Sequence, residues 1–170
     1  MKNISELIIS LNDKRRYFLN KNKTESLKKI EDNLNINFPN SIKEFYLFCN
    51  GGCIPDSLIS KKKLNDGRFY EEIEWGSSSF LTLEDIVYYY NLNEEYSINF
   101  KNEECLNSKR LIPFFRTKEQ EFLVFTETSL ILLAKEIDND QILWVEVYLN
   151  FEELLNEYIE NNGEVILKIQ

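Results

Sequence analysis

The chain has 170 residues, of which 43% are hydrophobic and 14% aromatic, and its formal net charge is −9. This composition excludes a disordered chain and predicts one folded domain with a sizeable core. The sequence has no histidine, no apolar run long enough to cross a membrane and no signal-peptide pattern. Three cysteines cannot all pair with one another, and their sparse use suits a reducing compartment, so we expect a cytoplasmic protein. Because no apolar run is long enough to cross a membrane, we also expect no contact with a membrane.

The acidic charge is concentrated after the first thirty residues. The chain has 20 basic and 29 acidic residues. Residues 1–30 contain 8 of the basic and 3 of the acidic residues, so residues 31–170 contain 12 basic and 26 acidic residues. Such an excess repels phosphate backbones and attracts basic protein surfaces. We therefore expect no nucleic-acid binding, although solubility alone would explain the charge equally well.

The first forty residues predict two helices. Asn3 and Glu6 fit a capping box, and apolar residues recur at helical spacing, so a first helix is expected from Asn3 to about Leu19. Thr24 is expected to cap a second helix. Pro39 holds the preceding residue in an extended backbone and ends the linker that follows.

A third helix is predicted over residues 41–50. Ser41 and Glu44 fit a capping box, and one face of the helix is apolar. Asn50-Gly51-Gly52 follows, and these residue types tolerate the left-handed backbone that ends a helix. This stretch lacks the spacing of a phosphate-binding loop. We therefore expect it to have a structural role, as the end of a helix and a sharp turn.

The next thirty residues predict a loop or hairpin and a fourth helix. Lysines 61–63 and Asn65-Asp66-Gly67 are typical of an exposed loop or hairpin. A short strand is expected over residues 71–76, followed by a loop over residues 77–79.

Thr82 and Asp85 fit a capping box for a helix that ends near Asn91. Three successive tyrosines, residues 88–90, lie on this helix. They cannot all face inward, so at least one ring should be partly exposed.

Four strands are predicted after Arg110, over residues 111–115, 122–125, 130–134 and 141–149. Their short connections require antiparallel pairing. Pro113 predicts an edge position or a bulge for the first of them. Apolar residues on both faces of the fourth predict a central strand that helices cover.

Asn150 is expected to cap a last helix that ends at Asn162-Gly163, and residues 164–169 are expected to form a terminal strand. The resulting fold class is α+β. It is a single domain with a central antiparallel sheet of about four to six strands, helices on the N-terminal side and a C-terminal helix.

Few residues suggest a chemical reaction. Cys49, Cys53 and Cys105 lack the paired spacing and the fourth ligand of a zinc site, so they are interpreted as inert thiols. Adjacent acidic pairs are frequent and are interpreted as solvated surface. Without histidine, no Ser-His or Cys-His nucleophile pair can form. We therefore expect a protein that is not an enzyme and needs no cofactor or metal.

The run from Ile30 to Gly52 resembles the signature of the SMI1/KNR4 (SUKH) superfamily. The resemblance rests on Glu31 in an Ile-Glu pair, Pro39 in the linker, an aromatic helix and Asn50-Gly51-Gly52. Residues 81–86, 111–114 and 147–155 resemble later blocks of the family in the same order. Residues 117–121 depart from the Gly/Asp-rich hairpin that members often carry.

The similarity spans roughly residues 24–160, which we expect to be the family-like core. Residues 1–23 would then be an extra N-terminal helix, and residues 161–170 a C-terminal extension.

The resemblance implies a protein-binding domain. Bacterial members are largely immunity proteins, which bind a cognate toxin, often a nuclease, and block it. We expect the same here, with a monomer or weak dimer that binds a basic toxin. The partner-binding residues are expected in the variable stretch after Gly52: Asp56, Asp66, Glu71, Glu72, Glu74 and Trp75.

Two alternatives remain. The fungal relatives imply a regulatory or scaffold domain that binds cellular signalling proteins. A carboxylate-based hydrolase is the weaker alternative, since a sequence does not show whether two acids converge on a cleft.

Overall fold

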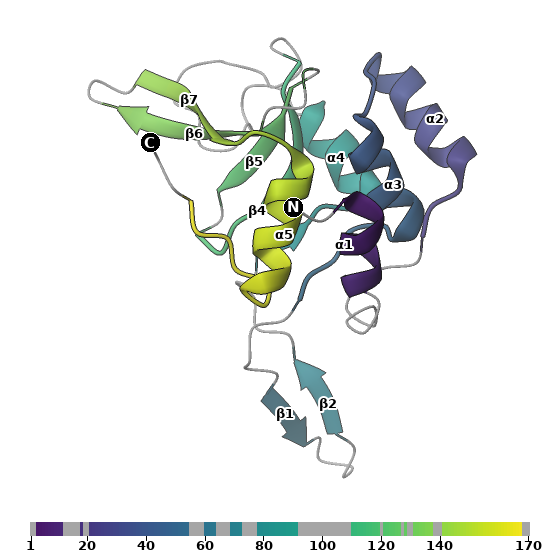
Figure 1. Cartoon of the computed structure of the whole chain (residues 1–170), viewed down its shortest axis with the longest axis vertical. Helices are drawn as coiled ribbons and strands as arrows, with labels where there is room; N and C mark the ends of the chain where they lie inside the picture. The colour runs from purple at the N-terminus through teal and green to yellow at the C-terminus, as the bar shows by residue number, and fades with distance from the viewer. Residues whose placement is uncertain are drawn as a thin grey trace.

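The computed structural model describes residues 3–11, 18, 21–54, 60–63, 69–72, 78–91, 110–119, 121–126, 128, 131–137 and 141–167. In these residues, helices pack on an antiparallel sheet, and a short hairpin stands apart from both (Figure 1). The α+β class and the predicted central sheet are confirmed.

The described helices are α1 (Ile4–Leu11), α2 (Thr24–Leu34), α3 (Asn40–Phe48), α4 (Leu83–Tyr90) and α5 (Phe151–Glu160). The main sheet has the spatial order β3 (Ser79–Phe80), β4 (Ile112–Arg116), β5 (Phe122–Phe125), β6 (Ile131–Ile137) and β7 (Gln141–Tyr148). All its neighbouring strands are antiparallel. The hairpin consists of β1 (Ser60–Lys63) and β2 (Phe69–Glu72).

The main core lies between one face of the sheet and the helices α1, α3 and α5, which pack against one another (Figure 1). Phe45 of α3 is fully buried, and its ring centroid lies 4.6 Å from that of Phe80 and 5.4 Å from that of Phe151. These rings join α3, β3 and α5, and aromatic pairs of this kind stabilise a core beyond the area that they bury.

One prediction about strand position is wrong: β7 is an edge strand of the described sheet rather than a central one. β4 lies between β3 and β5, so of the edge position or bulge predicted for Pro113 only the bulge applies. The apolar residues on both faces of β7 have another cause. Tyr148 joins the main core, whereas Trp144 packs on the opposite face, in a small cluster with Val124.

The bulge predicted at Pro113 is confirmed. The register between β4 and β5 shifts after Pro113, which lies opposite Val124, so that Phe115 lies opposite Leu123. The bulge lets an interior strand contain a residue that has no N–H to donate.

Three predicted helix caps are formed. Asn3 and Glu6 exchange two hydrogen bonds of 2.9 Å, and Thr82 and Asp85 form a capping box. The side chain of Asn150 accepts a hydrogen bond of 2.9 Å from the backbone N–H of Glu153. Each satisfies a backbone donor that the first helical turn leaves without a partner.

The predicted cap at Ser41 is not formed. Helix α3 begins at Asn40, directly after Pro39, with no side-chain cap. Proline fixes its own φ and takes the cap position two residues before Ser41, so the helix starts earlier than the Ser41 pattern indicates. Likewise, Thr24 is the first residue of α2 rather than its cap.

Three further boundaries differ from the predictions. The described part of α1 extends to Leu11, and Phe18, which was predicted to lie in the same helix, forms a β-bridge with Gly52. Ser79, predicted as loop, forms β3 together with Phe80, because Phe80 pairs with both Gly52 and Phe115. Residues 164–167 form no strand, and the backbone N–H of Ile166 instead donates to Glu157 Oε1 at 2.7 Å.

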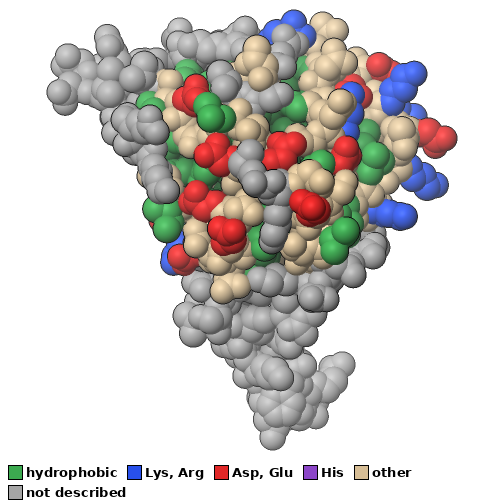
Figure 2. All heavy atoms as spheres, viewed as in Figure 1, with side chains coloured by type: hydrophobic (Ala, Val, Ile, Leu, Met, Phe, Trp, Pro, Cys, Tyr) green, Lys and Arg blue, Asp and Glu red, His purple; other side chains and the backbone are tan. Residues whose placement is uncertain are grey.

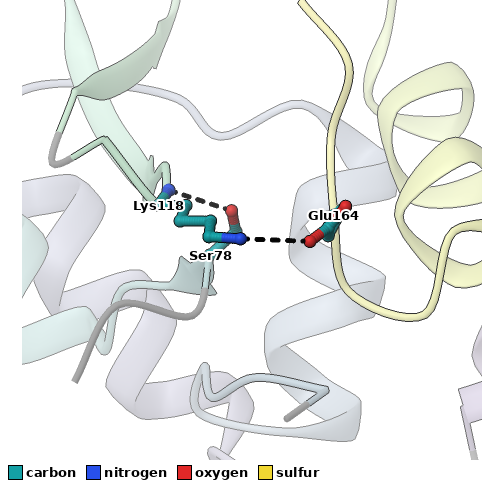
Figure 3. A network of polar contacts seen from close by, with 3 residues as sticks. All are labelled: Ser78, Lys118 and Glu164. Carbon is teal, nitrogen blue, oxygen red and sulfur yellow. Dashed lines mark hydrogen bonds and ion pairs between the residues drawn. The ribbon is translucent and has the colours of Figure 1, made fainter. Parts of the chain in front are cut away.

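The turn between β4 and β5 closes despite its departure from the family pattern. Thr117 N donates to the carbonyl of Glu121 at 2.8 Å, and Glu121 N donates to the Thr117 hydroxyl at 3.1 Å. Lys118 N donates to Ser78 Oγ at 3.0 Å, and Lys118 Nζ pairs with Glu164 at 3.3 Å (Figure 3). The turn is thereby attached to β3 and to the C-terminal segment.

One hydroxyl connects the base of the hairpin region to α5. The buried hydroxyl of Tyr158 accepts a hydrogen bond of 2.7 Å from Ile54 N and donates one of 2.9 Å to the carbonyl of Ser78. Two buried backbone groups far apart in sequence thus depend on one oxygen atom.

We predict that Tyr158→Phe lowers the free energy of unfolding by about 1–3 kcal/mol, because it leaves both buried backbone groups without their partner. Urea unfolding measures this difference. Tyr88→Phe is the matched control, since the Tyr88 side chain is exposed, and it should change stability by less than about 0.5 kcal/mol. Equal stability of the two variants would contradict the role given to the Tyr158 hydroxyl.

Candidate interaction surface

The side chain of Asn50 connects the end of α3 to the start of α4. Its Oδ1 accepts hydrogen bonds from Leu83 N at 2.9 Å and from Asn22 Nδ2 at 3.0 Å. Its Nδ2 donates to Glu84 Oε2 at 2.9 Å. Asn50 therefore satisfies a backbone donor in the first turn of a helix more than thirty residues away in the sequence.

The two glycines that follow Asn50 bring the backbone against β3. Gly51 and Gly52 have φ values of 75° and 126°, in the region that favours glycine. Gly52 and Phe80 exchange backbone hydrogen bonds of 3.0 and 2.8 Å. A Cβ atom on Gly51 would lie 2.5 Å from the carbonyl oxygen of Leu81. A side chain at position 51 therefore cannot fit without movement of the backbone.

Glu31 lies in the last turn of α2, and Pro39 is the last residue of the linker between α2 and α3. Glu31 Oε1 accepts a hydrogen bond of 2.8 Å from Phe38 N and forms an ion pair of 2.9 Å with Lys43 Nζ. The Phe38 ring is buried in the core. In this geometry the acid satisfies the backbone donor of a residue held extended by Pro39.

Most of the residues predicted to bind a partner lie outside the described residues. Asp56, Asp66, Glu74 and Trp75 belong to this group, whereas the backbone of Glu71 and Glu72 forms part of β2. In the hairpin register, Glu71 lies opposite Lys61. The two described strands contain three lysines and two glutamates, so their sequence is not that of an acidic surface.

The buried hydroxyls of Tyr46 and Tyr158 form structural hydrogen bonds. The Tyr46 hydroxyl is fully buried and donates to the carbonyl of Leu81 at 2.8 Å. Burial raises the pKa values of Tyr46, Tyr158 and the Cys53 thiol, so these groups stay protonated. Cys49 is buried, and Cys105 lies outside the described residues.

In the described part of the chain, no three His, Cys, Asp or Glu side chains come together as a metal site would require. No described helix is long and apolar enough to cross a membrane.

Acidic side chains gather on the face that carries α1 and α5, whereas lysines lie at the side of α2 (Figure 2). Helix α5 contains Glu152, Glu153, Glu157 and Glu160 and no basic residue. The sequence analysis identified the apolar stripe of α5 but interpreted its acids as ordinary solvated surface. The signal that could have indicated this surface is the absence of Lys and Arg from residues 149–167.

A family model described as the SMI1 / KNR4 family (SUKH-1) matches residues 21–157. The match begins before α2 and extends into α5, so it includes the Asn50-Gly51-Gly52 turn and its contacts with β3 and α4. No curated protein matches the chain.

We predict that Gly51→Val lowers the free energy of unfolding by more than about 2 kcal/mol. A left-handed φ is costly for a β-branched residue, and the new side chain meets the backbone of Leu81. Chemical denaturation measures the loss. Ser41→Ala is the control and should change stability by less than about 0.5 kcal/mol, because Ser41 forms no cap. A Gly51→Val protein of wild-type stability that no longer binds its partner would overturn the structural role.

Glu84 gives a prediction about pH. The hydrogen bond from Asn50 lowers the pKa of Glu84 below its ordinary value of 4.5 in the folded chain. A lowered folded pKa stabilises the protein above the unfolded pKa, and this contribution is lost as pH falls through the folded pKa. The stability difference between wild type and Glu84→Gln should therefore shrink from neutral pH to about pH 3. A difference that stays constant over this range would contradict the prediction, and Glu44→Gln serves as the surface control.

Proposed function

Because the chain belongs to the SMI1/KNR4 (SUKH-1) family, we propose that it is a non-catalytic protein-binding domain that neutralises a cognate toxin. The observation that carries the proposal is the charge of α5, which presents four glutamates and no basic residue. A surface of one sign favours a partner surface of the opposite sign.

A toxin that cleaves nucleic acid is the class that this charge fits best. A nuclease needs a basic surface to hold phosphates, and acidic side chains can occupy that surface in place of the substrate. Opposite charges also accelerate the encounter of two proteins, which suits an inhibitor that must act before damage accumulates. The acidic residues would thus contribute both to recognition and to speed.

Several groups that other proteins use for chemistry have structural roles here. The hydroxyls of Tyr46 and Tyr158 donate to backbone carbonyls, burial raises the pKa of the Cys53 thiol, and Cys49 is buried. Residues 31–170 hold 26 acids and 12 basic residues, so the excess charge belongs to the body of the protein. We propose that the protein acts in the cytoplasm, where the toxin would reach its target.

Co-expression with the toxin encoded by the adjacent gene tests the proposal. Cells that produce both proteins should survive, the two should purify as a complex, and an unrelated toxin should still kill. Cell death without complex formation would overturn the proposed function. A gene that stands alone, with no neighbouring toxin gene, would instead support a regulatory or scaffold role.

We predict that the rate of association depends strongly on salt. Raising the ionic strength from about 0.05 M to about 0.5 M should slow association at least about tenfold, with little change in dissociation, because salt screens the steering between unlike charges. Stopped-flow or surface-plasmon measurements give both rates. An association rate that does not respond to salt would contradict an electrostatic role for the acidic face.

A further inference from the structure

Two exposed apolar side chains flank the acidic face of α5. Leu149 and Ile166 are 64% and 59% exposed. Leu149 N donates to Glu153 Oε2 at 3.0 Å, and Ile166 N donates to Glu157 Oε1 at 2.7 Å. Since Glu153 and Glu157 are one helical turn apart, the four residues form one continuous patch. We call Leu149, Glu153, Glu157 and Ile166 the α5 patch.

The charge of Glu157 lies where it does not help the helix. Glu153 lies in the first turn of α5, which favours acids, but Glu157 is a like charge at i+4 from it, which destabilises an isolated helix. Glu157 also lies in the last turn, where the helix dipole favours cations, and no basic residue lies there. An acid that is unfavourable in two ways suggests a role other than helix stability.

A buried hydroxyl lies beside the same carboxylates. The side chain of Tyr148 is only 5% exposed, and its hydroxyl has no well-formed hydrogen bond to any described residue. Burial raises its pKa above the ordinary value, and the charges of Glu157 and Glu153 raise it further. The hydroxyl oxygen is itself buried from solvent, so it interacts with the Glu157 carboxylate rather than with a ligand at the surface.

The charge of this segment has one sign. Residues 149–167 contain five glutamates and no basic residue, and between described residues Glu164 pairs with Lys118. The backbone N–H groups that bind Glu153 and Glu157 leave the charge of both carboxylates in place. Two apolar side chains beside two acids match the composition of an interface with an apolar centre and a polar rim.

We propose that the α5 patch is the docking surface for the basic partner, an inference that rests on the proposed function. An arginine of the partner lies between Glu153 and Glu157, and apolar side chains next to it cover Leu149 and Ile166. Arginine fits because its planar group offers several donors in a fixed arrangement and can bind two carboxylates at once.

Two pairs of substitutions test this surface separately from the fold. Leu149→Lys with Ile166→Lys introduces repulsion at exposed positions. Glu153→Gln with Glu157→Gln removes the charges but keeps an amide oxygen to accept from each backbone N–H. The probe is the purified toxin domain encoded by the adjacent gene, with affinity measured by titration calorimetry and rates by stopped flow.

The lysine pair should weaken binding at least about 100-fold, because it removes the apolar contacts and adds like charge. The glutamine pair should weaken it about tenfold, mainly through slower association, and should reduce the salt dependence of the rate. Thermal unfolding should show that each variant folds. If the lysine pair does not fold, Leu149→Lys alone and the glutamine pair still decide the outcome.

Matched controls lie on other helices. Tyr88→Lys changes a side chain of α4 that is 60% exposed, and Glu25→Gln with Glu44→Gln removes two exposed charges from α2 and α3. Both controls should bind within about twofold of the wild type. Patch variants that bind as tightly as the wild type would overturn the docking surface and leave the proposed function standing. A wild-type chain that binds no toxin would overturn both.

Discussion

The arrangement of the helices depends on the close approach of the backbone at Gly51 to the carbonyl of Leu81. Gly51 follows the end of α3, and Leu81 lies between the end of β3 and the start of α4. Gly52 pairs with Phe80, and Tyr46 of α3 donates its hydroxyl to the same Leu81 carbonyl. Since no Cβ atom fits at position 51, two helices and a strand can share one small volume. The directions of α3 and α4 relative to the sheet follow from this contact.

The sequence predicted those elements whose signals are local. Thr82 and Asn150 cap their helices as expected, and the strand over residues 122–125 has the predicted bounds, because caps and apolar runs depend on nearby residues alone. The prediction failed where a distant contact decides the structure. Residues 79–80 form a strand because Gly52 and β4 lie beside them. Phe18, which was predicted to lie in the first helix, instead pairs with Gly52.

The position of β7 shows a second limit of sequence reasoning. Apolar residues on both faces of a strand indicate burial on both sides, and a central position is the simplest way to obtain it. Here the two faces contact different clusters. Tyr148 packs in the main core and Trp144 in the small cluster behind the sheet, so that an edge strand acquires the pattern of a central one.

The candidate surface was less predictable than the fold. Acids on the outer face of an amphipathic helix are ordinary, so the lack of basic residues in residues 149–167 does not by itself single out the acids of the proposed docking surface. What distinguishes the patch is that Ile166 lies beside Glu157. This follows from the turn at Gly163, whose φ is 97° and where a Cβ atom would lie 2.4 Å from the carbonyl oxygen of Ile54. Such a juxtaposition exists only in three dimensions.

The hydroxyl of Tyr158 has a consequence for how the protein can diverge. It holds the chain at Ile54, where the hairpin region departs from the body, and again at Ser78, where it returns. The two ends are therefore kept together whatever sequence lies between them. Since the entropy of closing a loop grows only slowly with its length, residues 55–77 can be exchanged or lengthened as a unit. Relatives could therefore acquire new segments at this point, and an engineer could graft a foreign peptide there, without redesigning the core.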